Sequence, residues 1–317
     1  MDYIVFDLEW NQCPNGKDKE NKHLPFEIIE IGAVKLNENR ETSQRFHRVI
    51  KPVVYEQMHF RTQEIIRIDK ESLNQGVSFP SALRDFLEWC GPDACFCTWG
   101  AMDLTELQRN MKFYGQLELL EGPVRFFDVQ KLFSISYEDG KSRKSLEYAT
   151  DYLEIPKGED FHRALADAFY TSEILKRISV DCMWANFSLD TYQNPKKKSE
   201  EIHIVYEKYE KYVSREFRTK EDAMKDREVV STRCFLCGKS AKKKIRWFSM
   251  NTKNHFCLAV CPEHGYLKGK IRMKKTDDGM TYVVKTLKLT DEDEAKMIRE
   301  KRELLRRKRK VKRHQGK

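Results

Sequence analysis

The chain has 317 residues, of which 40% are hydrophobic and 34% charged, and its net charge is +9. This length suggests about two domains, because single cores tend to stop growing near 250 residues. No run approaches the roughly 18 apolar residues that a membrane span requires. The N-terminus has no basic region and carries an acid at position 2, unlike a secretory signal, so we expect a cytoplasmic protein.

The first half alternates short apolar runs with amphipathic stretches, which is typical of an α/β fold. Three early strand candidates follow one another without a long helix between them, so they should form an antiparallel meander within a sheet of mixed direction. The predicted strands are 3–8, 28–36, 44–50, 94–98 and 124–127, and the predicted helices are 79–89, 104–114, 145–153 and 164–178.

The second half begins with a polar stretch at 194–199, which indicates a solvated linker, and continues with a charged segment at 200–217 that we expect to be helical. Strand candidates follow, and the sequence Thr-Asp-Asp-Gly at 276–279 predicts a hairpin turn. The strands expected here are 244–250, 255–260, 267–275 and 281–289, ahead of a basic helix that frays toward the C-terminus.

These patterns predict four parts of the chain: an α/β domain (1–182), a charged linker or helix (183–230), a basic β module (231–290) and a basic tail (291–317). Charge is divided unevenly between them. Residues 1–190 hold 23 Lys and Arg against 32 Asp and Glu, and residues 191–317 hold 36 against 18. A solvated charged surface is the plain interpretation of such a basic half, but an excess of this size favours binding to a polyanion.

Two acids, Asp7 and Glu9, interrupt the apolar strand predicted at the N-terminus. Alternate residues of a strand face the same side, so both carboxylates point the same way. Two close carboxylates repel each other and are costly to desolvate unless a cation compensates. We therefore expect a divalent metal here, the alternative being an edge strand with a polar outer face.

Three further residues are candidates for the same site. Asp167 lies on a predicted helix among small residues, and His162 precedes it by five positions, close to where that helix begins. Asp103 begins the sequence Asp-Leu-Thr-Glu, which would also serve as a capping box for the next helix. Each of these residues has a structural explanation when taken alone. Together they are a more specific signal for one functional site than any of them is alone.

Together these residues resemble the three motifs of the DEDDh exonucleases, the family that includes RNase T, oligoribonuclease, the DNA polymerase III proofreading subunit and the histone-mRNA-type exoribonucleases. The motifs are Phe-Asp-Leu-Glu at 6–9, the stretch ending in Asp at 98–103, and His-Arg-Ala-Leu-Ala-Asp at 162–167. The resemblance covers residues 1 to about 180. Stretches around 62–65, 78–89, 128–133 and 145–147 look like the histone-mRNA branch.

The resemblance implies a ribonuclease-H-like fold with two Mg²⁺ or Mn²⁺ ions, bound by Asp7, Glu9, Asp103 and Asp167. His162 would be the general base that takes a proton from the attacking water. The product would be a nucleoside 5′-monophosphate.

Trp10 directly follows the paired acids. An aromatic ring there could stack on the terminal base of a substrate, although packing in the core is an equally good explanation. The polar segment 11–23 could form a mobile lip beside the site.

Nine cysteines make an odd number, and five of them are scattered in a way that argues against a disulfide framework; these are Cys13, Cys90, Cys95, Cys97 and Cys182. The sequence Cys-x₂-Cys and a later Cys-x₂-His are typical of one structural zinc site. The expected ligands are Cys234, Cys237, Cys261 and His264, with His255 and Cys257 as alternatives. Basic residues with two aromatics at 239–248 favour nucleic-acid binding, or else docking on a protein.

The sequence thus predicts a metal-dependent 3′–5′ exonuclease for single-stranded 3′ ends. RNA is the favoured substrate, and a zinc-ribbon-like module with the basic tail would increase the affinity for structured or ribosome-associated RNA. The alternatives are a DNA 3′–5′ exonuclease, or a nucleic-acid-binding regulatory protein whose nuclease domain is slow.

Overall fold

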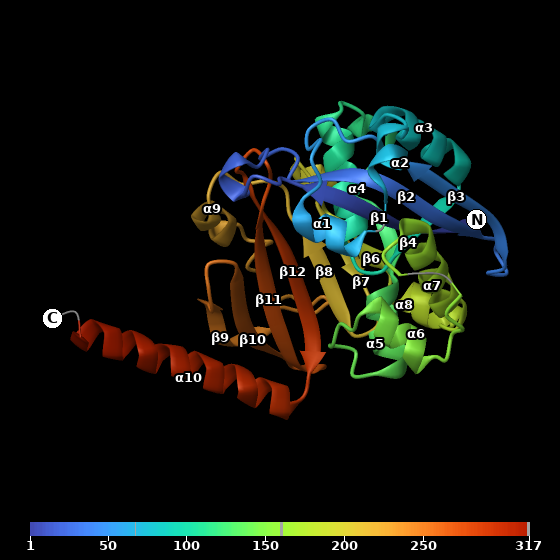
Figure 1. Ribbon diagram of the computed structural model, residues 1–317. Helices are drawn as coiled ribbons and strands as arrows, with labels where there is room; N and C mark the ends of the chain where they lie inside the picture. The colour runs from blue at the N-terminus through green and yellow to red at the C-terminus, as the bar shows by residue number, and fades with distance from the viewer. Residues whose placement is uncertain (67, 159–160, 316–317) are drawn as a thin grey trace. The chain divides into compact units, whose positions relative to one another are not determined.

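A computed structural model describes residues 1–66, 68–158 and 161–315. The chain divides into two compact units, Met1–Gln193 and Asn194–Lys317 (Figure 1). The boundary falls just before the stretch predicted as a solvated linker (194–199), which belongs to the second unit and in which Asn194 is buried. The α/β unit extends beyond its predicted end at 182. Within the described part of the chain, no helix is long and apolar enough to cross a membrane.

The first unit is built on a six-stranded sheet with the order β3-β2-β1-β4-β5-β6. β1, β2 and β3 form the predicted antiparallel meander, β4 and β5 add in parallel, and β6 adds antiparallel, so the predicted mixed sheet is confirmed. The strands are β1 Asp2–Gln12, β2 Phe26–Leu36, β3 Thr42–Val49, β4 Ala94–Thr98, β5 Arg125–Asp128 and β6 Ser188–Leu189.

Helices cover both faces of this sheet. Two of the predicted helices begin at serine caps: the side-chain oxygens of Ser78 and Ser145 accept hydrogen bonds from the amides of Ser81 and Tyr148. The helices are α1 Phe60–Ile65, α2 Lys70–Asn74, α3 Phe79–Cys90, α4 Met102–Phe113, α5 Val129–Tyr137, α6 Leu146–Tyr152, α7 Ala164–Lys176 and α8 Val180–Ala185.

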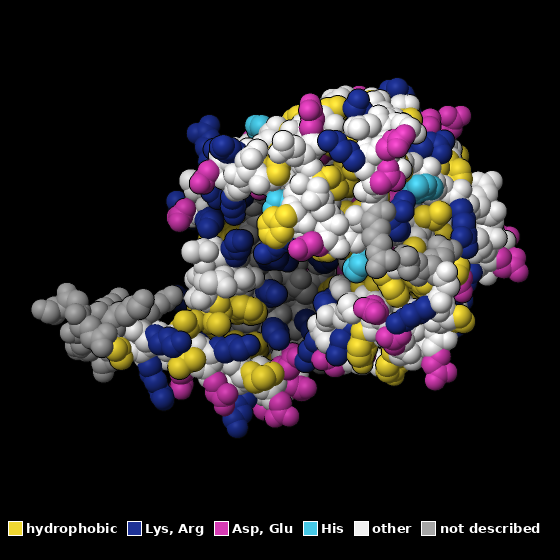
Figure 2. Space-filling view, in the orientation of Figure 1, with side chains coloured by type: hydrophobic (Ala, Val, Ile, Leu, Met, Phe, Trp, Pro, Cys, Tyr) yellow, Lys and Arg dark blue, Asp and Glu magenta, His cyan; other side chains and the backbone are white. Residues whose placement is uncertain are grey.

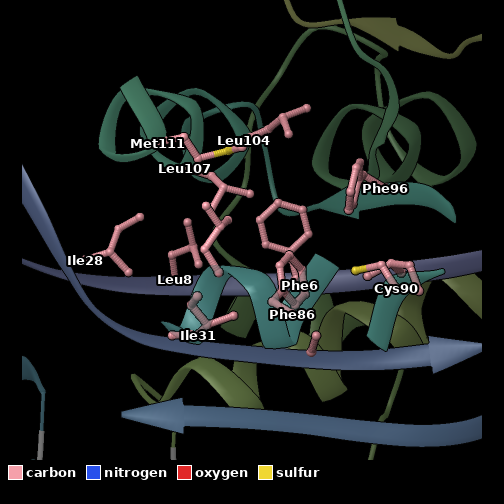
Figure 3. Close-up of a cluster of buried hydrophobic side chains, with 14 of the residues drawn as sticks. Phe6, Leu8, Ile28, Ile31, Phe86, Cys90, Phe96, Leu104, Leu107 and Met111 are labelled. Atoms are coloured by element: carbon pink, nitrogen blue, oxygen red, sulfur yellow. The ribbon is translucent and has the colours of Figure 1, made fainter. Parts of the chain in front are cut away.

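The central strand β1 divides its side chains between two hydrophobic cores. Phe6 and Leu8 pack among side chains of α3 and α4, where the Phe6 ring lies 5.6 Å from that of Phe86 (Figure 3). Tyr3 and Val5 belong to the core under α5 and α7. Because side chains alternate along a strand, Asp7 and Glu9 lie on the α7 side of the sheet.

The second unit is a six-stranded sheet with the order β7-β8-β12-β11-β10-β9, and all its neighbouring strands are antiparallel. The predicted turn at 276–279 joins β11 to β12, with Gly279 at a φ of 80°. The elements are β7 Ile202–Val205, β8 Tyr209–Val213, α9 Lys220–Lys225, β9 Lys242–Ser249, β10 Asn254–Cys261, β11 Gly265–Lys275, β12 Thr281–Thr290 and α10 Glu292–Gln315.

The C-terminal helix α10 matches the basic helix expected for the tail. Acidic side chains lie at its beginning and basic ones farther along (Figure 2). Residues 316–317 of the predicted tail lie outside the described residues.

The helix predicted at 200–217 is wrong, because this segment forms β7 and β8. Its apolar residues follow a two-residue period, as in Ile202 and Ile204, and Glu207 and Lys208 lie between the two strands. The high density of charged residues obscured this short alternation.

Candidate active site and cysteine–histidine cluster

Three of the predicted carboxylates meet on the α7 side of β1. Asp7, Glu9 and Asp167 each offer an oxygen atom, and these atoms all lie within 4.8 Å of one another. β1 supplies the first two from alternate positions and α7 supplies the third from its first turn. The structure therefore brings together residues that are about 160 positions apart in the sequence.

The close approach of α7 to the sheet depends on a small residue in β2. Gly32 pairs with Asp7 in the register of β1 and β2. A Cβ atom at Gly32 would lie 2.1 Å from the backbone nitrogen of Leu165 and 2.2 Å from the carbonyl carbon of Ala164. No side chain larger than glycine fits here unless α7, which carries Asp167, moves away.

Asp103 lies in the first turn of α4 and is only 5% exposed. α4 begins at Met102 after Ala101, so Asp103 is not an N-cap and the capping-box explanation is wrong. Its Oδ1 accepts a hydrogen bond of 3.3 Å from the amide of Leu8. The pairing of β4 with β1 ends at Val5. Farther along β1, the Asp103 carboxylate accepts the hydrogen bond of the Leu8 amide that a neighbouring strand would otherwise accept.

Loss of solvation and mutual repulsion raise the pKa values of all four carboxyls. The pKa of Asp7 lies well above its usual value, chiefly through burial and then through Asp103 and Glu9. Burial first, and the neighbouring carboxylates next, raise the pKa of Glu9 to about 8. Burial raises the pKa of Asp103 to about 7 and that of Asp167 to about 6.

This cluster fits a divalent cation. Oδ1 of Asp167 is buried and has no hydrogen-bond partner among the described residues. A buried carboxylate oxygen without a donor is costly, and the cost disappears when a cation binds it. Carboxylate oxygens are hard ligands, which suit Mg²⁺ or Mn²⁺.

His162 lies at the solvent edge of this cluster. Its side chain is exposed, and its backbone amide donates a hydrogen bond of 3.3 Å to Oδ2 of Asp167. Its φ of 67° is in the left-handed region, which non-glycine residues rarely adopt. Strain of this kind is common at functional sites.

Glu30 of β2 was not among the predicted site residues. It is fully buried opposite Glu9, and its carboxylate accepts hydrogen bonds from Arg163 at 2.8–3.3 Å and from the amide of Ala164 at 3.3 Å. His47 Nε2 lies 2.6 Å from it. Burial alone would raise the pKa of Glu30, but the hydrogen bonds from His47 and Arg163 outweigh it and hold the pKa below its usual value.

The Glu30 contacts fix the backbone between His162 and the first turn of α7. The sequence signal for this role was that Glu30 is one of two acids, with Glu27, inside a mostly apolar run at 26–36.

Trp10 is half-buried, with its ring 5.7 Å from that of Phe26. The register between β1 and β2 shifts between Glu9 and Trp10, and the Trp10 side chain packs against the core under α3 and α4. Stacking of Trp10 on a substrate base stays a prediction.

In the second unit, the residues expected to bind zinc form a compact Cys₃His cluster. One atom from each lies within 4.8 Å of the others. The Cys237 and Cys261 sulfurs are 3.5 Å apart, and Nδ1 of His264 is 3.7 Å from the sulfurs of Cys234 and Cys261. A tetrahedral site with metal–sulfur bonds of about 2.3 Å has edges of roughly 3.7 Å, so this cluster could hold zinc.

The alternative ligands His255 and Cys257 lie on β10 outside that cluster. Cys257 is buried against Gly269, where an added Cβ would come within 2.4 Å of its sulfur. Its role in the structure is therefore packing.

The family model described as Exonuclease (RNase T) matches residues 4–175, which is more than half of the chain. The matched segment contains all five residues of the predicted DEDDh set. The chain belongs to the RNase T exonuclease family.

Among solved structures, the chain is similar to the nuclease domain of 3′hExo, a DEDDh family member bound to rAMP. The identity is 17% and the TM-score 0.51, over 59% of this chain and 96% of that one. It is also similar to the cell-death related nuclease CRN-4, with 18% identity and a TM-score of 0.46 over 56% and 62% of the two chains. A third similar structure is E. coli exonuclease I in complex with single-stranded DNA. The identity is 15% and the TM-score 0.45, over 55% of this chain and 40% of that one.

The chain thus spans less than two thirds of CRN-4 and of exonuclease I. No curated protein matches its sequence.

Proposed function

We propose that this protein is a metal-dependent 3′–5′ exonuclease that releases nucleoside 5′-monophosphates from single-stranded 3′ ends, with RNA as the preferred polymer. The observation that supports this most strongly is the convergence of Asp7, Glu9 and Asp167 around a buried carboxylate oxygen without a donor. The chain is also similar to a DEDDh nuclease domain whose structure was solved with rAMP, and this similarity supports the choice of RNA.

In this mechanism Asp7, Glu9, Asp103 and Asp167 would hold two Mg²⁺ or Mn²⁺ ions. The ions would supply charge neutralisation for an in-line displacement at the terminal phosphodiester. The four side chains contribute fixed positions, because β1, α4 and α7 hold them against two hydrophobic cores.

His162 acts as the general base. Its exposed side chain accepts a proton from the water that attacks the terminal phosphodiester and passes that proton to solvent. The bond between phosphorus and the 3′-oxygen breaks, and the departing 3′-oxygen takes a proton from solvent to leave a 3′-hydroxyl end. The contacts of Glu30 with Arg163 and Ala164 keep the backbone beside His162 in place.

The test is a time course with matched 3′-labelled and 5′-labelled RNA and DNA oligonucleotides in Mg²⁺ or Mn²⁺. We expect stepwise shortening from the 3′ end, faster on RNA, that is lost in Asp167→Ala and falls roughly 100-fold or more in His162→Ala. His203→Ala is the control, since His203 lies in the second unit and pairs with Glu210. Shortening from the 5′ end, or full activity of Asp167→Ala, would refute the proposal.

We also infer that Cys234, Cys237, Cys261 and His264 bind one structural Zn²⁺ ion. The expected content is about one zinc per chain by elemental analysis, lost in Cys234→Ser and retained in Cys182→Ser, which changes a cysteine of the first unit. A carefully prepared sample without zinc would contradict this inference.

A further inference from the structure

The two faces of the second sheet differ in how they are covered. Residues 214–241 and the Cys₃His cluster pack on one face, where Ile271, Met273 and Val283 are buried. Trp247 lies on this covered side, and its Nε1 donates a hydrogen bond of 3.0 Å to the carbonyl of Val230. It packs beneath the covering segment, so the Trp247 ring itself is not open to stack on a base.

The opposite face, which we call the open face, carries charge of one sign. The register of β7, β8, β10, β11 and β12 places no Asp or Glu on it among the residues described for these strands. The charged side chains that it carries are Lys211, Lys268, Lys270, Arg272, Lys274 and Lys288.

β11 runs through the middle of this face with Lys268, Lys270 and Arg272 at alternate positions, roughly 7 Å apart. Lys288 lies directly opposite Lys268 on β12, and like charges in this position destabilise a sheet. Partial burial and then the charges of Arg272 and Lys268 lower the pKa of Lys270.

Part of this charge has a partner within the protein. Lys268 pairs with Glu294 of α10 at 3.5 Å. Lys288 is exposed and acts electrostatically on the same Glu294. Lys270 and Arg272 are exposed, and the part of the chain that the structure describes contains no ion pair for either. A bound polyanion would relieve the remaining repulsion.

Aromatic side chains border the same column of cations. Phe256 of β10 lies directly opposite Lys270, and its ring is 6.5 Å from that of Phe248. α10 packs on one end of this face through Ala295 and Ile298. A sheet face with cations at alternate positions of a strand, next to aromatic rings, suits a nucleic-acid strand, whose phosphates repeat and whose bases stack.

We propose that the open face of the second sheet, centred on Lys268, Lys270 and Arg272 of β11, binds the phosphate backbone of the single-stranded nucleic acid that the first unit degrades. This inference rests on the proposed exonuclease function only for the identity of the strand. The backbone interaction does not read sequence, so every single strand of sufficient length should bind.

The experiment measures the binding of a fluorescein-labelled 20-nucleotide RNA by anisotropy over a series of KCl concentrations. It uses the full chain with Asp167→Asn, so that the RNA stays intact. We expect the Lys270→Glu/Arg272→Glu variant to weaken affinity roughly tenfold or more and to reduce the salt slope by about 1.4, at about 0.7 per lost phosphate contact. Lys275→Glu is the matched control, because Lys275 is an exposed lysine of the same strand on the other face.

A second comparison separates the open face from the cations around the covering segment. Lys243 and Arg246 line a hollow of about 610 Å³ with Arg227 and Arg233. The proposal is overturned if Lys243→Glu/Arg246→Glu abolishes binding while Lys270→Glu/Arg272→Glu does not. It is also overturned if Lys275→Glu weakens binding equally, or if polyglutamate competes as well as RNA of equal charge.

Hydrolysis of a dinucleotide by proteins with Asp167 intact tests the active site separately. We expect Lys270→Glu/Arg272→Glu to retain this activity within twofold. In the anisotropy experiment, Lys270→Gln/Arg272→Gln should also weaken RNA affinity, but less than Lys270→Glu/Arg272→Glu does. If the dinucleotide and every oligonucleotide resist hydrolysis while the RNA still binds through the open face, the exonuclease function fails and the binding surface stands.

Discussion

Asp7, Glu9 and Asp167 place three carboxyl groups in a space where their charged forms repel one another. This arrangement reduces the stability of the metal-free fold, because each group must either remain protonated or hold an uncompensated charge. A bound cation removes that cost and so links metal binding to folding.

The sign of the resulting pH dependence follows from the pKa values. Unfolded carboxyls titrate near pH 4, whereas in the fold Asp167, Asp103 and Glu9 have pKa values of about 6, 7 and 8. The folded state therefore binds more protons between about pH 4 and 8, and its stability falls as pH rises through this range. Thermal unfolding of the metal-free, zinc-retaining protein should show a Tm that decreases from pH 5 to pH 8.

Added Mn²⁺ should raise the Tm more at pH 8 than at pH 5, because deprotonated ligands bind the ion better. Asp7→Asn/Glu9→Gln removes two of the repelling charges and should flatten both dependences. An equal effect of Mn²⁺ on this variant and on the wild type would show that the ion binds elsewhere.

Glu30 illustrates a residue whose importance depends on its contacts in the fold. Glu30→Gln removes the negative charge that accepts hydrogen bonds from Arg163 and from the amide of Ala164. The expected loss is about 1.5–3 kcal/mol in the free energy of unfolding, the usual range for hydrogen bonds to a charged group. We also expect a lower kcat, because the backbone beside His162 loses its support.

Glu38→Gln provides the control for Glu30→Gln, since Glu38 is exposed in the turn between β2 and β3. Denaturant unfolding and single-turnover hydrolysis measure the two effects. Unchanged unfolding of Glu30→Gln would show that the ion pair contributes no net stability.

At the scale of elements, the contact between β2 and α7 sets the position of Asp167. Gly32→Ala places a Cβ atom 2.1 Å from the Leu165 backbone nitrogen, so α7 must shift. Overpacking of this kind costs about 1–3 kcal/mol, and activity should fall further because Asp167 moves from Asp7 and Glu9. Gly158→Ala is the control, since an added Cβ there meets no atom within 4 Å.

Elements were predictable where one periodicity extended over enough residues. β1, β2, α3 and α7 have long apolar patterns, and each was expected within a few residues of its observed bounds. β7 and β8 have only four and five residues, so their alternation was too short to compete with the helical appearance of a charged segment. β6 is a two-residue strand defined only by its partner β5.

The candidate site was predictable as a set of residue types in a given order. Asp7 and Glu9 were assigned from alternation alone, but Asp103 and Asp167 each had a structural explanation until the family motifs were considered together. Glu30 could not be assigned, because its partner Arg163 is 133 positions away and only the fold brings them together.

At the scale of the whole molecule, the two units each have their own sheet and core. A fragment of residues 1–193 should therefore fold and hydrolyse a dinucleotide at close to the full-length rate. The same fragment should bind a 20-nucleotide RNA less tightly, because it lacks the basic second unit. Equal RNA affinity of the fragment and the full chain would place the binding surface in the first unit.

The boundary itself can be tested with a fragment that ends at residue 182. It lacks β6 and Asp190, whose carboxylate accepts hydrogen bonds from Thr105 at 2.9 Å and Gln108 at 2.8 Å on α4. Loss of these buried contacts should lower the Tm by about 5 °C or more relative to 1–193, at roughly 2–4 °C per kcal/mol for a unit of this size. Equal Tm values would show that α4 needs no support from β6 and Asp190.

Alternate side chains of β1 lie either in the hydrophobic core or in the carboxylate cluster. This alternation limits where residues can be inserted or deleted during evolution. One inserted residue between Val5 and Asp7 would move every later side chain of the strand to the opposite face. The carboxylates would then enter the core under α3 and α4, and Leu8 would occupy the metal-binding side. Insertions and deletions should therefore accumulate in residues 13–25, between β1 and β2, and be eliminated from residues 3–9.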